Sequence, residues 1–283
     1  MLKIAISNES ISIKLIEKTL QQAGLDVMIS PETEDILLSR RFPSEVRFMS
    51  NSQIMQALKF GQQDVAIIDS YILDELGIPY KPIYSFEETR MPMSIFVPST
   101  VKYRSLRMFM TSKIASFAPN LLRAYLKEKR IRNVTIIDDP TPQKAVKMGI
   151  ADFFADFTPI VKSPQHIPTE TFLQSRLVML ISPEILPEKR DVFVDELIFR
   201  LDSVVKASSK VKVEIMCDEK YINKIVALIS GLDENMLILS SFNKQKIIIQ
   251  MLVDERQIWD IQHYLKELKV DRILVQEVAK IIV

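Results

Sequence analysis

Residues 135–163 read TIIDDPTPQKAVKMGIADFFADFTPIVKS. The stretch predicts a strand, a loop broken by proline, a short amphipathic helix, a glycine at Gly149 and a second strand that ends near Asp156. In α/β proteins the chemistry collects on loops at the carboxyl ends of strands. We therefore expect any active site of this protein within residues 135–163.

Strands and helices alternate through the chain on both sides of this stretch. Such alternation is typical of an α/β fold with a mostly parallel sheet that helices cover. The apolar patterns predict helices at 12–22, 52–60 and 120–129. They predict strands at 2–6, 45–49, 65–68, 93–97, 112–115, 134–137 and 177–181.

Two segments of the chain share one pattern. QALKFGQQDVAII (56–68) and KAVKMGIADFFAD (144–156) each give a short helix, a glycine, an aspartate and an apolar strand. Gly61 then matches Gly149, as left-handed helix ends, and Asp64 matches Asp152, as turn residues. Two lobes with matching turns, and a strand at 177–181 that returns the chain to the first lobe, resemble type II periplasmic binding proteins, whose ligands lie between the lobes.

The pattern changes after an amphipathic helix at 190–207. The following elements are ordered βαββαβ, which predicts a ferredoxin-like domain. Cys217 is expected as a small buried hydrophobe and Trp259 as a core residue. The expected organisation is a discontinuous lobe I at 1–89 and 171–207, a lobe II at 90–170 and a regulatory domain at 208–283.

Composition limits the function. The 283 residues are 47% hydrophobic and 26% charged, with a net charge of +1, which gives no strong field toward nucleic acid or a membrane surface. The start, MLKIAISNES, lacks the apolar core of a signal peptide, so we expect a cytoplasmic protein. With 5 glycines, the chain has neither of the glycine-rich phosphate loops, GxGxxG or GxxxxGK[ST].

Four motifs carry a resemblance to a known family. They are FAPNLLRAYLKEK (117–129), GIADFFAD (149–156), INKIVALISGL (222–232) and IWDIQHYLKELKVDRILVQEVAKII (258–282). Together they resemble the long form of ATP phosphoribosyltransferase, the first enzyme of histidine biosynthesis. The resemblance implies condensation of ATP with phosphoribosyl pyrophosphate, Mg²⁺ as cofactor and a homo-oligomer, a dimer or hexamer. It also implies histidine as an effector at the C-terminal domain.

The resemblance also implies site residues, and assigns no metal ligand. Asp156 and Asp152 take the catalytic positions, although an Asp before a strand or at its end is also a common turn or capping residue. Asp156 could orient a ribose hydroxyl or a Mg²⁺-bound water. The residues that would contact substrate are Thr158, Lys162, Gln143 and Asp69.

Several positions depart from the family pattern. The family's Ser/Thr-Gly-x-Thr-Leu phosphate loop reads Phe157–Lys162 here, and its Lys-Gly-Arg element reads Asn8-Glu9-Ser10. Its Arg and Asp in Arg-x-x-Asp-Ile-Pro are Ser50 and Gln53. Because polyphosphates need charge-assisted donors, a second hypothesis stays open. It is a non-catalytic homologue that binds histidine or a nucleotide, or that regulates an active partner.

Overall fold

The computed structural model describes residues 1–10, 12–27, 37–158, 160–161, 164–229, 237–240, 246–268 and 270–282. The chain divides into two units. The first holds Met1–Lys18 and Leu25–Val194, and the second holds Thr19–Gly24 and Asp195–Val283. The predicted division into two lobes and a regulatory domain with a boundary at 208 stays a prediction.

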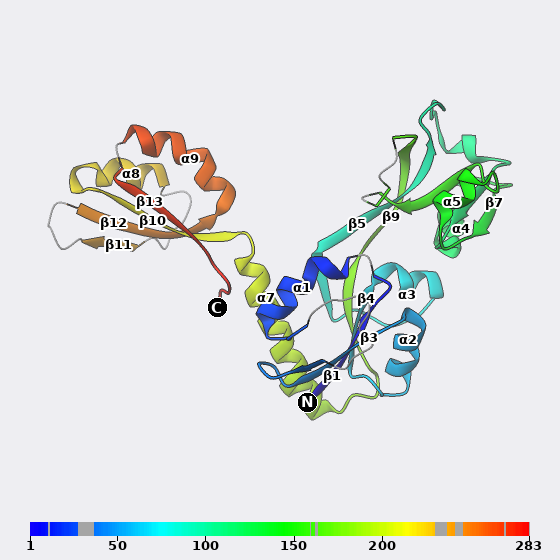
Figure 1. The fold of residues 1–283 in the computed structure, drawn as a ribbon, viewed down its shortest axis with the longest axis horizontal. Helices are drawn as coiled ribbons and strands as arrows, with labels where there is room; N and C mark the ends of the chain where they lie inside the picture. Colours follow the sequence, from blue (N-terminus) through cyan, green and yellow to red (C-terminus); the bar gives the residue numbers. More distant parts are fainter. Residues whose placement is uncertain are drawn as a thin grey trace. The chain divides into compact units, whose positions relative to one another are not determined.

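The strands of the first unit are β1 (Leu2–Ser7), β2 (Leu37–Ser39), β3 (Ser44–Met49), β4 (Val65–Asp69), β5 (Tyr84–Pro98), β6 (Lys113–Ser116), β7 (Thr135–Asp138), β8 (Phe153–Phe157) and β9 (His166–Ile181). Within the described residues they form one sheet, in the order β2-β3-β1-β4-β9-β5-β8-β6-β7 (Figure 1). β1 lies parallel to β3 and β4, and β6 lies parallel to β7 and β8. The predicted mostly parallel sheet holds only within these two groups, because β2, β5 and β9 pair antiparallel with their neighbours.

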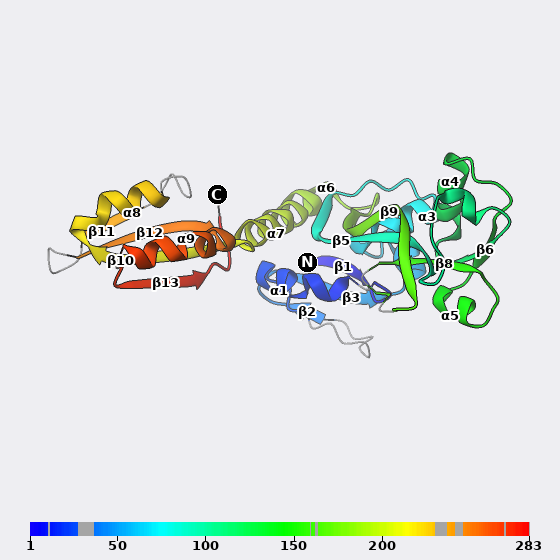
Figure 2. The same cartoon turned by 90° about the horizontal axis from the view of Figure 1, so that it is seen from above.

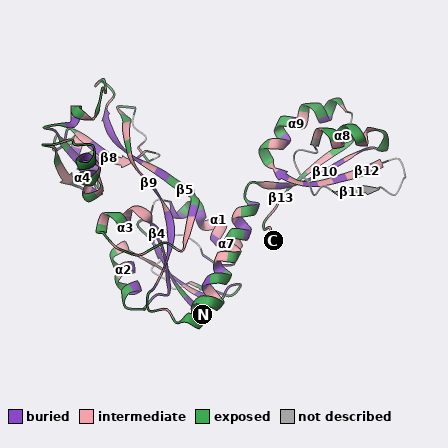
Figure 3. Cartoon of the chain, turned by 180° about the vertical axis from the view of Figure 1, so that it is seen from behind, coloured by how far each residue is buried: buried purple, intermediate pink, exposed green. Residues whose placement is uncertain are grey.

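β5 and β9 join the two parallel groups. They are the longest strands, of 15 and 16 residues, and they pair with each other antiparallel as far as Pro98 and His166 (Figures 1 and 2). The last part of β9 pairs with β4, and β5 pairs with β8. The strand predicted at 177–181 therefore returns the chain to the first group, as expected. β4 is buried along its whole length (Figure 3). Strands pair with both its edges, and Ala66 and Ile68 pack in an apolar cluster.

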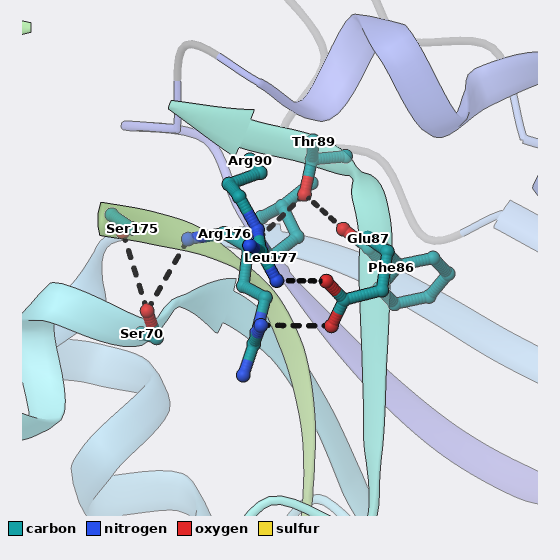
Figure 4. Close-up of polar contacts among 8 residues, drawn as sticks. All are labelled: Ser70, Phe86, Glu87, Thr89, Arg90, Ser175, Arg176 and Leu177. Atoms are coloured by element: carbon teal, nitrogen blue, oxygen red, sulfur yellow. Dashed lines mark hydrogen bonds and ion pairs between the residues drawn. The ribbon is translucent and has the colours of Figure 1, made fainter. Parts of the chain in front are cut away.

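The β5–β9 ladder is interrupted between Phe86 and Met91, where β5 holds extra residues. Thr89 lies in this interruption and is fully buried. Its hydroxyl donates to the Phe86 carbonyl at 2.6 Å and accepts from the Leu177 amide at 2.8 Å (Figure 4). The Thr89 side chain thus makes hydrogen bonds where the backbone pairing of β5 and β9 is interrupted.

Charged side chains bridge the same crossing. The Glu87 carboxylate pairs with Arg90 on its own strand and with Arg176 on β9, at 2.8 Å for the second pair (Figure 4). Ser70 and Ser175 lie beside them with their hydroxyls 3.4 Å apart. The crossing is held by side chains as well as by the backbone ladder.

Helices of residues 1–194 follow the strands in the expected order. They are α1 (Glu17–Ala23), α2 (Asn51–Lys59), α3 (Ser70–Leu76), α4 (Pro119–Glu128), α5 (Pro142–Lys147) and α6 (Pro187–Lys189). Short 3₁₀ turns lie at Ile13–Ile16 and Leu106–Phe109, and a π turn lies at Arg190–Val194. The helix predicted at 12–22 is therefore a 3₁₀ turn followed by α1. Similarly, the one predicted at 190–207 has a π turn at its start.

The second unit contains α7 (Asp195–Ala207), β10 (Lys210–Asp218), a 3₁₀ turn (Glu219–Tyr221), α8 (Ile222–Ile229), β11 (Leu237–Ser240), β12 (Lys246–Asp254), α9 (Glu255–Glu267) and β13 (Arg272–Glu277). Its antiparallel sheet has the order β11-β12-β10-β13, with α8 and α9 side by side on one face (Figures 1 and 2). This is the predicted ferredoxin-like βαββαβ arrangement.

The second unit tests the predicted burial of two residues, Cys217 and Trp259. Cys217 is fully buried in the apolar core of this unit, as predicted. Trp259 is 67% exposed, so the prediction that it is a core residue was wrong. The buried side of α9 is formed by Ile258, Ile261 and Leu265. Trp259 follows Ile258 by one residue, or about 100° around the helix, which turns it away from that side.

One helix was absent from the prediction. α3 begins directly after β4 without an intervening loop and is seven residues long, ending at Gly77 with a φ of 63°. Such a short apolar segment carries little periodicity of its own. Among the described residues, none of the helices has the length and apolar character needed to cross a membrane.

Candidate functional site

A cleft of about 740 Å³ lies at the carboxyl ends of β4 and β8. Asp69 ends β4, and Asp156 and Phe157 end β8. Residues that follow β1 and β7, and residues of α2, α3 and α5, also line it, together with Phe117 and Ile160. Open α/β sheets bind ligands beyond the carboxyl ends of their strands, and the volume is in the range of small-molecule sites. The cleft is therefore the candidate functional site.

Most of the charged side chains that line the cleft are acidic. Glu9, Asp69, Glu75 and Asp156 line it, and Lys144 is the one basic residue among its described lining. Carboxylates gathered in one cleft repel any further negative charge, most strongly where burial weakens the screening by water. The cleft therefore disfavours a ligand that carries several phosphates.

Burial raises the pKa of two of these carboxyl groups. Asp69 is only 4% exposed, and this burial raises its pKa to about 6, although a hydrogen bond with the Ser10 side chain opposes the shift. Burial also raises the pKa of Asp156, against the opposing effect of the Phe157 amide, which donates to Asp156 Oδ1 at 2.7 Å. Both groups hold a proton at a higher pH than an exposed aspartate does.

Tyr71 reports the sign of the local potential. Burial raises the pKa of its hydroxyl, and the nearby carboxyl groups of Asp69, Glu9, Glu75 and Asp156 raise it further. A negative potential makes loss of a phenolic proton less favourable. The cleft is thus electrostatically negative at the position of this ring.

Carboxylates of the protein already occupy helix N-termini at the cleft. Glu9 Oε2 accepts the Asn51 amide at the start of α2 at 3.0 Å. Glu75 accepts the Asn120 and Leu121 amides at the start of α4, at 3.0 and 2.9 Å. Helix N-termini are the usual places where backbone amides bind phosphate. In this protein those amides are bonded to its own carboxylates.

Three aromatic rings form one wall of the cleft. Tyr71, Phe117 and Phe157 have ring centroids 5.5 to 5.6 Å apart. Phe157 is 3% exposed and packs with Met93 and Ala118. The residue directly after Asp156 is therefore a core side chain and not part of an open loop.

The predicted site residues fall into separate groups. Asp156, Asp69 and Gln143 all line the cleft. Thr158 is half-buried outside that lining, and its hydroxyl lies 2.9 Å from the Ser94 hydroxyl. Lys162 lies outside the described residues.

Asp152 lies at the other end of its strand, before β8 begins. Its Oδ2 accepts the Lys113 amide at 2.8 Å, and its own amide donates to the Lys113 carbonyl at 2.9 Å. Asp64 makes the same two contacts with Lys3, at 2.7 and 2.9 Å. The geometry gives Asp152 the turn role that the repeated pattern suggested, and places it away from the cleft in which a catalytic residue is expected.

The sequence reasoning missed some of the cleft. Glu75 and Tyr71 come from α3, which was not predicted, so no signal placed them at the site. Phe117 precedes α4 in a motif that was noted only for its resemblance. Lys144 is exposed on α5 and also lines the cleft.

Comparison with known proteins finds relatives that share one name. No protein-family model matches the chain. The ATP phosphoribosyltransferases of Parabacteroides distasonis and Azobacteroides pseudotrichonymphae are 25% and 27% identical to it, and each match covers 100% of both chains. The chain is therefore similar over its whole length to proteins named ATP phosphoribosyltransferase, at an identity that marks it as diverged from them. The fold also matches the ATP phosphoribosyl transferase (HisG:HisZ) complex from Thermotoga maritima, with a TM-score of 0.55 and 17% identity, over 71% of this chain and 99% of that one.

Two of the departures from the ATP phosphoribosyltransferase pattern have structural consequences. Ser50 and Gln53, which replace a charged pair of the family, form a capping box at the start of α2. Glu9, in the element that carries two basic residues in the family, bonds to the amide at the same helix start. Both positions now stabilise a helix N-terminus.

Magnesium fits this cleft poorly as a site made by protein alone. Among the described residues, no three His, Cys, Asp or Glu side chains converge in a way that would hold a metal ion. Glu9 and Glu75 are bonded to backbone amides, and burial favours the protonated form of Asp69. Mg²⁺ is usually held by one or two carboxylates together with substrate phosphates. An ATP phosphoribosyltransferase cleft of this kind would need the phosphates to complete the coordination.

Proposed function

We propose that this protein serves histidine biosynthesis as an ATP phosphoribosyltransferase-like protein that has lost catalysis. The proposal rests on one observation. The carboxylates of Glu9 and Glu75 fill the helix N-termini of α2 and α4, in a cleft with four acidic residues and one lysine. Phosphoribosyl pyrophosphate would have to displace these carboxylates and bind against the remaining negative charge.

The electrostatic penalty supports this reading. A hydrogen bond to a charged group contributes roughly 1.5–3 kcal/mol, so the exchange of several basic donors for carboxylates removes a large part of substrate affinity. The role left to the protein is to bind histidine or a nucleotide, or to regulate an active partner. The matched Thermotoga structure is itself named as a complex of two proteins, which makes a partner the more concrete form of this role.

A second candidate is the enzyme itself. Asp156 and Gln143 still line the cleft, and Lys144 supplies one positive charge there. The reaction would displace pyrophosphate from the sugar by a ring nitrogen of ATP. Asp156 would orient a ribose hydroxyl, and the protein would act by positioning the two substrates. The full-length match to proteins named ATP phosphoribosyltransferase favours this candidate.

A turnover assay separates the two candidates. Purified protein is incubated with ATP, phosphoribosyl pyrophosphate and Mg²⁺, with the Parabacteroides distasonis protein as the positive control. We expect no product above background, and no heat of binding for phosphoribosyl pyrophosphate in calorimetry. Steady product formation would remove the non-catalytic proposal. Calorimetry with histidine and with ATP then tests which ligand the non-catalytic form binds. If neither gives a heat of binding, regulation of a partner is the remaining role.

Further properties follow from the resemblance and are proposed with it. They are binding of histidine at the ferredoxin-like domain, a dimeric or hexameric homo-oligomer, and a cytoplasmic location. Mg²⁺ would be needed only in the catalytic candidate.

A further inference from the structure

A second pocket, of about 530 Å³, lies at the C-terminal end of α4 and the loop that leads into β7. It shares no lining residue with the cleft. Its lining comes entirely from residues 123–136, a continuous part of the chain. A substitution in the lining of the cleft therefore leaves the lining residues of this pocket unchanged.

Positive charge distinguishes this pocket from the cleft. Arg123, Lys127, Arg130 and Arg132 line it, and none of them forms an ion pair with a carboxylate of the described residues. Residues 99–137 contain nine Lys and Arg and one acidic residue, Glu128, which pairs with Lys129. In a chain of net charge +1 this is a strong local excess. Such unpaired cations attract phosphate.

The floor of the pocket is apolar. Leu126 is 3% exposed, and Ile131, Val134 and Ile136 are half-buried around it. These side chains also pack into the core beneath α4. A cationic rim over an apolar floor suits a ligand with a flat apolar body and an anionic group, which is the chemistry of a nucleotide.

Backbone geometry brings the charges together. α4 ends with a left-handed residue, Arg130 at a φ of 58°, and the Ile131 amide bonds back to the Leu126 carbonyl at 2.8 Å. Asn133 is also left-handed, at 61°. Glycine is the residue that such helix ends favour, yet this position holds an arginine. The two turns fold the loop back so that Arg130 and Arg132 join the side chains of α4.

We propose that this pocket is a second ligand site, which binds a nucleotide through its phosphate and its base. The arginines and the lysine hold the phosphate, and the base lies on Leu126, Val134 and Ile136. The site uses none of the cleft residues, so it is separate in space from the cleft that carries the proposed function.

Calorimetry on the full chain with GMP, guanosine and inorganic phosphate tests the proposal. GMP should bind at one site per chain, and at least tenfold more tightly than either guanosine or phosphate alone. The double variant Arg123→Gln/Arg132→Gln should weaken GMP binding at least tenfold. Val134→Thr, which keeps the shape of the floor, should weaken GMP binding and leave phosphate binding unchanged.

Two control variants locate the binding. Arg104→Gln/Arg107→Gln removes two exposed charges of the same segment outside the pocket, and Lys144→Gln removes the one lysine charge in the described lining of the cleft. Neither should change the affinity for GMP, and circular dichroism should show that every variant is folded. The proposal is overturned if GMP does not bind, or if Lys144→Gln abolishes its binding. It also fails if the Arg104/Arg107 pair weakens binding as much as the pocket pair does, since that would indicate general surface charge.

Discussion

Asp69 is a buried acidic residue of the cleft with a raised pKa. It is almost fully buried at the end of β4, with a pKa raised to about 6. A buried carboxylate without a cationic partner is destabilising, and the group responds by holding its proton. This single residue links the electrostatics of the cleft to the stability of the fold.

The Asp69 carboxyl group should make stability fall as pH rises between about 4 and 6. In this window the folded chain binds the proton more tightly than the unfolded chain, so the stabilisation is complete below the unfolded pKa of 3.8 and is lost through the folded value. Asp69→Asn should remove this slope and raise the free energy of unfolding by roughly 2 kcal/mol at pH 7.5, since one pKa unit corresponds to about 1.4 kcal/mol.

Urea unfolding of wild type and Asp69→Asn at pH 4 and pH 7.5 measures the effect. The two proteins should differ clearly at pH 7.5 and little at pH 4, because Asp69 is protonated in both states at the lower pH. If wild type and Asp69→Asn have the same free energy of unfolding at both pH values, Asp69 is solvated in the folded state.

At the scale of elements, the two matching helix-to-strand turns behave differently under the same substitution. Gly61 and Gly149 both have a positive φ, of 62° and 70°. A Cβ at Gly61 would lie 2.9 Å from Glu184 Cβ, whereas nothing lies within 4 Å of one at Gly149. Gly149→Ala should lose about 1–2 kcal/mol from the left-handed backbone alone. Gly61→Ala should lose more, because it adds a steric clash.

The midpoints of thermal unfolding for the two variants check this difference. If both variants lose the same stability, the Glu184 segment moves away without effect and the backbone explains the whole loss. The comparison needs no other control, since each glycine serves as the control for the other.

The interruption in the β5–β9 ladder gives a second prediction for an element. Thr89→Val keeps the size of the side chain but leaves the buried Leu177 amide without its acceptor (Figure 4). An unsatisfied buried donor costs about 1–3 kcal/mol. Thr89→Ser keeps the hydroxyl and is the matched control. Urea unfolding should show a larger loss for Val than for Ser, and the reverse order would mean that the methyl group matters more than the hydrogen bonds.

The sequence predicted elements well where the apolar periodicity was strong. It predicted them poorly where tertiary contacts determine the structure. The strands at 65–68 and 177–181 and the βαββαβ order were readable from their apolar patterns. α3 was not, because seven residues directly after a strand give no separate pattern. Trp259 was misplaced because an aromatic residue was taken as core without following the buried side of α9, which Ile258 and Leu265 mark.

The site was predicted in position more than in chemistry. Asp156, Asp69 and Gln143 line the cleft, because β4 and β8, one from each parallel group, both end there. The roles of Glu9 and Glu75 as helix caps could not be read, since each depends on a contact with an amide 42 to 46 residues away. Long-range polar contacts leave no periodic trace in a sequence.

At the scale of the whole first unit, Glu75 connects α3 to α4 across the cleft. Glu75→Ala should speed hydrogen exchange of the Asn120 and Leu121 amides, because both lose their acceptor. Loss of an N-terminal cap should also lower the free energy of unfolding by about 1 kcal/mol. Asp74→Asn, an exposed change on the same helix, is the control. Unchanged exchange at both amides would mean that the contact is open in solution.

The antiparallel pairing of β5 and β9 also makes residues 99–165 an insertion whose two ends are adjacent. The Ser99 amide donates to the Gln165 carbonyl at 2.7 Å, so the two ends of this piece lie side by side. Insertions with adjacent ends can be exchanged between relatives without breaking the chain that receives them. Such a graft would carry the basic pocket whole, because residues 123–136 all belong to it. It would carry only one side of the acidic cleft, so the two sites can be inherited separately.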